Sequence, residues 1–357
     1  MFYTHALVGG GAERVWARLA AGFARRGDEV DFVVDFEAKE NLRFLGDAAR
    51  LVVLPRGHAA ATLALAGHLR RRKPHASLSA ISVSNLKHTA AATLASRRDR
   101  AIISYHGFYE NERERLSNIG YRLTRLLSTA TARTIAVSDS LRSDLIARFG
   151  VAPERVARIF NPAAPDPFPP DRSAAEIAAR APVVVAIGRL APDKNFVGLL
   201  HAFARVKTPG ARLRILGEGP MRDALMTLRS ELGLENKVEL PGFSYDVSAD
   251  LVRARCFVLS SFKETFGLAC VEALACGLPC IVTACGGPQE IINSPDLGAV
   301  VPVDDAEALA SAIDAALQSA GDPAPRQTRA RDFVLDVAVD RYDEMISYVT
   351  SHARSPA

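Results

Sequence analysis

Apolar residues recur along the chain in two alternating patterns. Continuous apolar runs of four or five residues, such as Val183 to Ile187 and Cys256 to Leu259, predict strands that are buried on both faces. Longer segments between these runs have the apolar spacing of helices. Because strand and helix alternate in this way through both halves, the pattern predicts an α/β fold made of doubly wound parallel sheets.

A proline-rich segment interrupts the alternation near the middle of the chain. Its prolines stand at positions 162, 165, 167, 169 and 170 and exclude both helix and central strand. With 357 residues, 48% of them hydrophobic, the chain is long enough for two cores. We therefore expect an N-terminal domain at 1–165 and a second domain that begins at 166.

Three consecutive glycines follow the first predicted strand. Gly9, Gly10 and Gly11 stand where this strand turns into a helix, and glycines there let backbone N–H groups approach a phosphate. Gly9 and Gly11 resemble a dinucleotide fingerprint, with Asp35 at the end of the second strand as its ribose-binding acid. Because Arg14 occupies the third glycine position, we prefer a phosphate-facing loop of another kind, and a simple tight turn remains open.

Two further segments of the N-terminal half have more than one interpretation. His106 follows the strand Ala101 to Tyr105 at the carboxyl edge, where open α/β sheets bind ligands, so a ligand contact and a structural role are both open. An arginine-rich helix is predicted from Glu110 to Ala132. It could pack on its own sheet or lie on an anionic membrane surface. The basic run Arg70 to Lys73 is interpreted as a solvated helix end.

In the C-terminal half, glycine-bearing loops follow several strands. Arg189 and Lys194 lie five positions apart on the loop after Val183 to Ile187, an arrangement that suits a diphosphate. Segments 216–220 and 241–243 repeat the arrangement of a strand followed by glycine. Since the carboxyl ends of parallel strands share one edge, these loops are expected on a single rim.

The segment from Lys263 to Pro279 combines two acids with a helix start. A short helix is predicted from near Phe266 to Gly277, and it carries Glu272 among apolar neighbours. A carboxylate there costs several kcal/mol without hydrogen-bonding partners. Glu264 lies in the preceding loop, and the free N–H groups of the first helical turn form an anion site between the two acids. This combination indicates a sugar nucleotide.

Charge and cysteine content indicate in which cellular compartment the protein is expected. Residues 1–165 carry 25 Lys and Arg against 15 Asp and Glu, and the remainder carries 19 against 25, so the first half is basic and the second acidic. No apolar run approaches the roughly 20 residues of a membrane span, and no secretory signal precedes the first strand. The cysteines, an odd number on apolar elements, indicate buried, reduced thiols in a cytoplasmic protein. A zinc site is the alternative, although no Cys-x2-Cys pair supports it.

Taken together, these motifs resemble the family 4 retaining glycosyltransferases with the GT-B fold. The donor-domain likeness rests on Gly188-Arg189 with Lys194, Leu216-Gly217-Glu218-Gly219-Pro220, Pro241-Gly242-Phe243, Glu264-x7-Glu272 and Gly286-Gly287-Pro288-Gln289-Glu290. The N-terminal likeness rests on Gly9 to Arg14, His106-Gly107 and Ile159-Phe160-Asn161-Pro162. The resemblance covers nearly the whole chain. The sequence begins almost inside its first strand, so either this strand is short or the natural start lies earlier.

The resemblance implies two Rossmann-like domains facing across a cleft, the second at 166–335. It also implies a terminal helix within 336–357, about Asp336 to Tyr348, that crosses back to the first domain. It also implies metal-independent transfer of a sugar from a nucleotide diphosphate with retention, without a cofactor other than the nucleotide-sugar co-substrate. The acceptor attacks on the same face and the departing phosphate takes its proton, so no glycosidase-like carboxylate pair is needed. By this resemblance, Arg189 and Lys194 contact the diphosphate, Gly10 and Gly11 approach the leaving phosphate, and the N–H groups of Phe266, Gly267 and Leu268 cap the phosphate. Glu272 accepts from both ribose hydroxyls, and Glu264 and His106 contact the donor sugar. The same nucleotide site also includes Gly188, Gly219, Phe243 and Thr265.

Within that family uridine diphosphate is the commoner donor base, so we expect a UDP-sugar, although no residue decides the base. The basic first half favours a glycan or lipid-linked acceptor for polysaccharide or lipopolysaccharide synthesis, on the inner face of the membrane, and not nucleic acid. Two alternatives stay open. One is a nicotinamide-dependent oxidoreductase using Gly9, Gly11 and Asp35, and the other is a non-catalytic sugar-nucleotide-binding protein.

Overall fold

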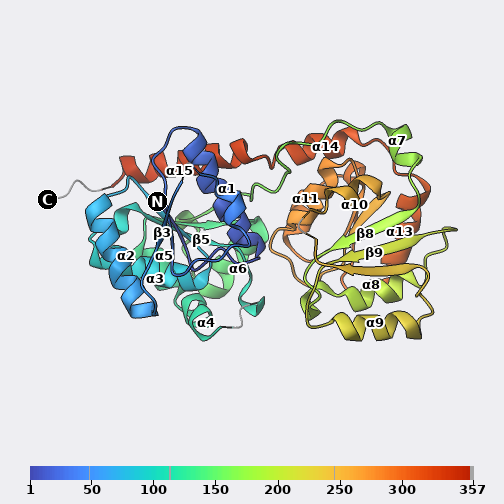
Figure 1. Cartoon of the computed structure of the whole chain (residues 1–357), viewed down its shortest axis with the longest axis horizontal. Coiled ribbons are helices and arrows are strands. Elements are labelled where there is room, and N and C mark those ends of the chain that lie inside the picture. The colour runs from blue at the N-terminus through green and yellow to red at the C-terminus, as the bar shows by residue number, and fades with distance from the viewer. Residues whose placement is uncertain (48, 112–113, 245, 354–357) are drawn as a thin grey trace. The chain divides into compact units, whose positions relative to one another are not determined.

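The chain folds into two compact units, each with its own parallel sheet (Figure 1). The structure is a computed structural model that describes residues 1–47, 49–111, 114–244 and 246–353. One unit runs from Met1 to Pro162 and takes up the chain again at Leu335, while the other runs from Ala163 to Val334. Helices and strands alternate in both units. The predicted α/β class with two doubly wound sheets is therefore confirmed.

The sheet of the first unit has the strand order β3-β2-β1-β4-β5-β6-β7. All neighbouring strands pair in parallel. The strands are β1 (Phe2–Thr4), β2 (Asp31–Val34), β3 (Arg50–Val53), β4 (Ser77–Ala80), β5 (Ala101–Tyr105), β6 (Arg133–Ala136) and β7 (Val156–Arg158). Because the chain adds β2 and β3 on one side of β1 and β4 on the other, the strand order reverses between β1 and β4. Open sheets bind ligands at the carboxyl edge of such a switch point.

Helices cover this sheet, and the last helix of the chain belongs to this unit. The helices are α1 (Gly11–Arg25), α2 (His58–Arg72), α3 (Ser82–Leu94), α4 (Arg115–Arg122), α5 (Thr124–Ala130), α6 (Asp139–Phe149) and α15 (Leu335–Ser351). Helix α15, red in Figure 1, packs on α1, with the Trp16 and Tyr342 rings 6.0 Å apart. A Cβ at Gly22 of α1 would lie 2.7 Å from Val339, so the two helices approach closely only because residue 22 has no side chain.

The prediction of one continuous arginine-rich helix from Glu110 to Ala132 is wrong. The structure has two helices, α4 and α5, which meet at Leu123, and residues 112 and 113 of the predicted helix lie outside the described part of the chain. The hydroxyl of Thr124 donates to the carbonyl oxygen of Tyr121 at 2.6 Å. Side-chain hydrogen bonds of this kind compete with the helical ladder, which explains the interruption.

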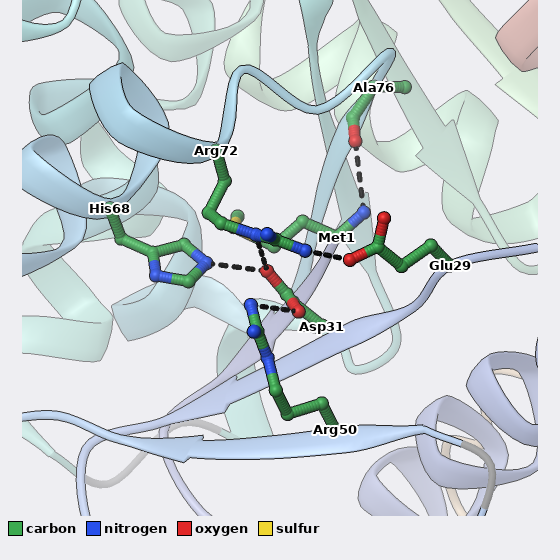
Figure 2. Close-up of polar contacts among 7 residues, drawn as sticks. All are labelled: Met1, Glu29, Asp31, Arg50, His68, Arg72 and Ala76. Atoms are coloured by element: carbon green, nitrogen blue, oxygen red, sulfur yellow. Dashed lines mark hydrogen bonds and ion pairs between the residues drawn. The ribbon is translucent and has the colours of Figure 1, made fainter.

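A buried ion cluster joins helix α2 to the amino edge of the sheet (Figure 2). Asp31, at the start of β2, contacts His68 at 2.9 Å, Arg72 at 3.2 Å and Arg50 at 2.6 Å. Burial alone would raise the pKa of Asp31, but the hydrogen bond from His68 and the charge of Arg50 hold it below its ordinary value. The basic run at the end of α2 is therefore not simply solvated, because Arg72 bonds Asp31 and also contacts Glu29.

The second unit has the strand order β10-β9-β8-β11-β12-β13, again with parallel pairs. Its strands are β8 (Val183–Ile187), β9 (Arg212–Leu216), β10 (Val238–Gly242), β11 (Cys256–Leu259), β12 (Cys280–Thr283) and β13 (Gly298–Val301). Its helices are α7 (Ala174–Ala178), α8 (Phe196–Phe203), α9 (Arg222–Glu231), α10 (Ser248–Arg253), α11 (Leu268–Ala275), α12 (Gly287–Ile291), α13 (Ala306–Gln318) and α14 (Ala324–Arg331). The apolar runs predicted as central strands coincide with β8 and β11, and the switch point lies between these two strands.

Other predictions about the chain can also be compared with the structure. Residues 161–173, which include the proline-rich segment, contain neither helix nor strand. All five cysteines are buried free thiols, and burial raises the pKa of Cys276 and Cys285 to about 11, so both stay protonated at neutral pH. Across the described residues, each helix is too short or too polar to cross a bilayer.

Candidate active site

Two charged side chains meet at the switch point of the second unit. Lys194 lies on the loop after β8, in a short 3-10 turn from Pro192 to Lys194, and Glu264 lies on the loop after β11. The Lys194 ammonium forms an ion pair with the Glu264 carboxylate, and both side chains are partly exposed. The loops after β8 and β11 are therefore joined across the centre of the sheet.

Backbone hydrogen bonds hold three rim loops side by side. They run from the N–H of Gly188 to the oxygen of Leu216 (3.0 Å), from Leu190 to Glu218 (2.9 Å) and from Gly217 to Gly242 (2.9 Å). The contact is possible because Gly217 has no side chain: its φ is +145°, and a Cβ there would overlap the Gly188 carbonyl oxygen. At Gly219, φ is +158° and a Cβ would crowd Leu190. These glycines bring peptide groups, not side chains, to the rim.

The rim continues on the other side of β8. Ser260, after β11, donates its hydroxyl to the Lys194 carbonyl oxygen at 2.9 Å. The N–H of Glu264 donates to Cys285 after β12, and the N–H of Gly287 donates to Glu264, each at 2.9 Å. Since the backbone on both sides of Glu264 is fixed in this way, the carboxylate that faces Lys194 is held by a rigid loop.

The charge at this rim is mixed. Burial alone would lower the pKa of Lys194, but the neighbouring Glu264 carboxylate raises it above its ordinary value, so the side chain is an ammonium at neutral pH. The Arg189 guanidinium is about half exposed and lies 3.7 Å from Asp193 on its own loop. The sequence predicted both cations as site residues, but not their pairing with Glu264 and Asp193. An incoming diphosphate would compete with these carboxylates for the two cations.

Helix α11 begins later than predicted. It starts at Leu268, not near Phe266, because Gly267 has φ +95° and a non-helical conformation. The Phe266 ring is buried and packs edge-to-face on Phe333 at 5.6 Å, so only its peptide group can face a ligand. The first N–H groups of a helix have no partner in a preceding turn, which is the arrangement that an anion site requires. In the first turn of α11 the N–H of Cys270 donates to the Gly267 oxygen at 3.0 Å.

Glu272 lies in the second turn of α11 and is only partly buried. Its predicted apolar neighbours Val271, Ala273 and Leu274 are buried, whereas Glu272 itself is partly exposed. A partly exposed carboxylate remains accessible to a ligand. Phe243, after β10, is 58% exposed, while Thr265 is buried next to the start of the helix.

In the first unit, Gly10 is the residue before helix α1. Asn41 donates to the carbonyl oxygens of Val8 and Gly10, the latter at 3.0 Å, and its own N–H donates to Leu7 at 3.1 Å. Sequence reasoning missed Asn41, since an asparagine 30 residues downstream gives no local signal. It fixes the glycine loop, so Gly10 and Gly11 open α1 at the carboxyl edge of β1.

His106 follows β5 and is partly buried. Its Nε2 lies 3.0 Å from the hydroxyl of Ser104, and its ring packs edge-to-face on Trp16 at 5.7 Å. Burial lowers the pKa of His106 to about 4, so the imidazole is neutral at physiological pH and forms hydrogen bonds as an uncharged ring.

Asp35 is not available as a ribose-binding acid. Its buried carboxylate accepts hydrogen bonds from the Tyr3 hydroxyl at 2.9 Å, from His5 and from Lys87. A dinucleotide fold requires this acid to face the cofactor. The structure therefore does not favour the nicotinamide interpretation, which depended on Asp35.

Two family descriptions match the chain in succession. Residues 9–166 match Glycosyltransferase Family 4, and residues 168–332 match Glycosyl transferases group 1. The chain therefore belongs to the family 4 glycosyltransferases, and its two doubly wound units form the two-domain GT-B fold.

Two relatives and one solved structure illustrate the similarity. The lipopolysaccharide core biosynthesis glycosyltransferase LpsE of Rhizobium meliloti is 37% identical over 144 residues, 40% of this chain and 42% of LpsE. An N-acetylgalactosaminyltransferase of Campylobacter jejuni, which acts on N-acetylgalactosamine-N,N'-diacetylbacillosaminyl-diphospho-undecaprenol, is 32% identical over 162 residues, 45% of this chain and 44% of that enzyme. The chain thus matches less than half the length of these relatives. Anabaena HepE, crystallised with UDP and glucose, has the same fold, with a TM-score of 0.82 at 19% identity and coverage of 97% of this chain and 98% of HepE.

Proposed function

We propose that this protein transfers a sugar from a nucleoside diphosphate sugar, with a UDP-sugar preferred, to a glycan or lipid-linked acceptor. The observation that carries the proposal is the pairing of Lys194 with Glu264 at the switch point of the second unit, beside Arg189 and the glycine rim. Cations, exposed peptide groups and carboxylates at one rim match the phosphates and hydroxyls of such a donor.

In this proposal the two cations carry the chemistry. Arg189 and Lys194 hold the diphosphate and stabilise the negative charge that develops on it as the bond to the sugar breaks. Glu264 accepts hydrogen bonds from the donor sugar, and Glu272, still accessible on α11, accepts them from the ribose. The N–H groups from Phe266 to Leu268 cap the phosphate. His106 and the Gly10–Gly11 turn supply the contacts proposed for the first unit.

We further propose retention of the anomeric configuration without a metal ion. The departing phosphate oxygen takes the proton of the acceptor hydroxyl, so the protein needs no general base. Two fixed cations at the diphosphate can supply the charge neutralisation that a divalent ion would otherwise give. Adding EDTA to the assay tests this part, and lost activity that magnesium restores would contradict it.

The donor preference and the acceptor class rest on the relatives. HepE was crystallised with UDP, LpsE acts in lipopolysaccharide core synthesis, and the Campylobacter enzyme uses a polyprenyl-diphosphate-linked sugar. A polar donor and a lipid-linked acceptor meet only at a membrane surface. We therefore propose a cytoplasmic protein that binds the inner face of the membrane peripherally.

Helices α4 and α5 of the first unit offer a surface for such binding. Arg115, Ile119 and Arg122 lie about one turn apart on α4, and Arg125 and Leu126 lie on α5. All five side chains are exposed. Basic side chains interleaved with apolar ones are the composition of helices that lie at an anionic interface.

Vesicle flotation tests this surface. The protein is expected to float with vesicles that contain phosphatidylglycerol at low salt and to be released as the salt concentration rises, because the attraction is electrostatic. An Arg122→Glu/Arg125→Glu variant should float less, whereas Arg205→Glu, an exposed arginine of the second unit, should behave as the wild type. Equal flotation of both variants would contradict the assignment.

A thermal-shift comparison tests the donor. UDP and UDP-glucose are expected to raise the melting temperature, because a ligand that binds only the folded state stabilises it by about 2.7 kcal/mol at one hundred times its Kd. GDP should raise it less and NADH not at all. Stabilisation by NADH alone would favour the oxidoreductase alternative. Stabilisation by UDP-glucose without any release of UDP, even with acceptor glycans present, would indicate the non-catalytic one.

A further inference from the structure

The carboxyl edge of the first sheet carries a second group of charged and aromatic side chains. Tyr3 lies in β1, His5 follows it, Asp35 follows β2, and Lys87 projects from α3, which begins after β4. These elements adjoin the switch point between β1 and β4. The group thus lies where open sheets bind ligands, at the opposite edge from the Asp31 cluster of Figure 2.

The cluster is built around one carboxylate. Asp35 accepts from Tyr3, His5 and Lys87, and both Asp35 and Lys87 are nearly inaccessible, with 8% and 5% of their side chains exposed. His5 remains 26% exposed. The buried pair of opposite charges is satisfied internally, and His5 is the member of the cluster that reaches solvent.

These contacts determine the tautomer of His5. Its Nδ1 faces an oxygen of Asp35 at hydrogen-bonding distance. Since a carboxylate only accepts, Nδ1 must carry the hydrogen, and in the neutral ring Nε2 is then a hydrogen-bond acceptor. The Lys87 ammonium lies 3.4 Å from the same Nδ1 and has Asp35 as its better acceptor. The cluster therefore presents an acceptor nitrogen at the edge of the sheet.

Aromatic rings border His5 on two sides. Phe36 lies edge-to-face on its ring at 5.1 Å and is itself 41% exposed, and the ring of His58, at the start of α2, stacks on it at 6.0 Å. An exposed aromatic face next to an oriented polar atom is the usual composition of a site for an amphipathic ring.

The backbone beside this cluster is strained. Ile81, between β4 and α3, has φ +66°, a conformation that a β-branched residue rarely adopts. Strain of this kind persists only where the surrounding structure fixes it, and it gathers at functional sites. The hydrogen bond from Asn85 N to Ile81 O at 2.9 Å fixes the start of α3, the helix that carries Lys87.

The charge of the cluster limits the ligand. Asp35 and Lys87 neutralise each other, and His5 donates to Asp35 through Nδ1. The cation of the cluster, Lys87, is buried and already paired with Asp35, so the cluster does not favour a phosphate or carboxylate, whereas Arg189 of the second unit is about half exposed. Within the described residues, no three His, Cys, Asp or Glu side chains are arranged to hold a metal ion. A neutral, hydroxyl-bearing ligand fits the cluster best.

Resting on the proposed function, we propose that His5 and Phe36 bind a neutral sugar residue of the acceptor. The C–H face of the pyranose lies against Phe36, and one of its hydroxyls donates a hydrogen bond to Nε2 of His5. Asp35 and Lys87 do not touch the sugar. They act as positioning residues, because they hold His5 in the tautomer that accepts.

Saturation-transfer NMR tests the subsite without knowledge of the natural acceptor. The probes are the methyl glycosides of glucose, galactose and N-acetylglucosamine, each added to the full-length protein saturated with UDP. At least one probe is expected to receive saturation. Phe36→Ala and His5→Gln are expected to weaken its binding at least tenfold, and Leu63→Ala, an exposed apolar residue of α2, should have no effect. No transfer to any probe in the wild type, or equal binding by all variants, would overturn the proposal.

The same samples separate this inference from the proposed function. UDP binding is expected to be unchanged in all three variants, because His5, Phe36 and Leu63 are not among the residues proposed to contact the nucleotide. If UDP does not bind the wild type, the proposed function fails whatever the glycosides do. If UDP binds and the glycosides do not, only the subsite fails.

A nitrogen-15 spectrum of the imidazoles tests the positioning role. In the wild type, His5 is expected to carry its hydrogen on Nδ1, and a signal from the Nε2–H form would contradict the assignment. Asp35→Asn is expected to abolish this preference, whereas Tyr3→Phe, which leaves the carboxylate in place, should preserve it. A purely structural role for Asp35 would not change the tautomer. Because the wild-type spectrum is itself decisive, the test does not depend on the folding of Asp35→Asn.

Discussion

Lys194→Ala and Arg189→Ala are each expected to reduce turnover of the nucleotide sugar at least 100-fold. The physical reason is that a preorganised cation next to the breaking bond contributes about 3 kcal/mol to transition-state stabilisation, which corresponds to a factor of about 100 in rate. The measurement is the rate of UDP release from the UDP-sugar that stabilises the protein. Lys237→Ala, an exposed lysine just before β10 at the amino edge of the same sheet, is the matched control and should retain the wild-type rate.

The ion pair of Lys194 with Glu264 offers a second explanation for an activity loss in Lys194→Ala. It must be distinguished from a direct contact of Lys194 with the substrate. Loss of Lys194 leaves Glu264 without this partner, and this alone could distort the loop after β11. In a double-mutant cycle, Lys194→Ala/Glu264→Gln removes the uncompensated carboxylate. If Lys194 acts on the substrate, the double variant is expected to be no faster than Lys194→Ala. Recovery to near the wild-type rate would show that Lys194 serves only to neutralise Glu264.

Gly217→Ala is expected to destabilise the second unit and to abolish nucleotide binding. The new Cβ would overlap the carbonyl oxygen of Gly188 in a backbone conformation with φ +145°, so the loops after β8 and β9 must separate. We expect a loss of about 3 kcal/mol, which for a unit of this size lowers the melting temperature by about 6–12 °C. UDP should then give no further thermal shift.

Gly233→Ala is the matched control for this substitution. Gly233 lies in the same unit and also has a positive φ, +64°, but a Cβ there would meet no atom within 4 Å. It should cost about 1 kcal/mol from backbone strain alone and leave UDP binding intact. Equal losses in the two variants would show that strain, and not contact between the rim loops, determines the stability.

The sequence predicted the sheets well because their physical signal is local. Short apolar runs bounded by turn residues indicate buried strands, and they reproduce the bounds of β8 and β11. The loop after β8 was also predictable, because it follows such a run, and the loops after β9 and β10 were predicted from their glycines. The start of α11 was predicted two residues early, since apolar spacing continues through Phe266 and does not reveal that Gly267 leaves the helical region.

Partnerships between distant residues were not predictable in the same way. Lys194 and Glu264 are 70 positions apart, and their pairing depends on β8 and β11 being neighbours in the sheet. The alternative that used Asp35 as a ribose-binding acid stayed open, because nothing near Asp35 in sequence shows that Lys87, 52 positions away, is buried against it. A residue type and its spacing predict the chemistry that is available. The strand order decides which of these groups are already paired with another side chain of the protein.

The packing of α15 on α1 affects the order in which the two units fold during synthesis. Helix α15 begins at Leu335, so the first unit cannot complete its core while the ribosome is still making the second. Domains usually fold in the order of synthesis. Here the second unit, continuous from Ala163 to Val334, can fold first. The first must wait until Tyr342 reaches Trp16, the one tryptophan of the chain, whose fluorescence would therefore report the last step of folding.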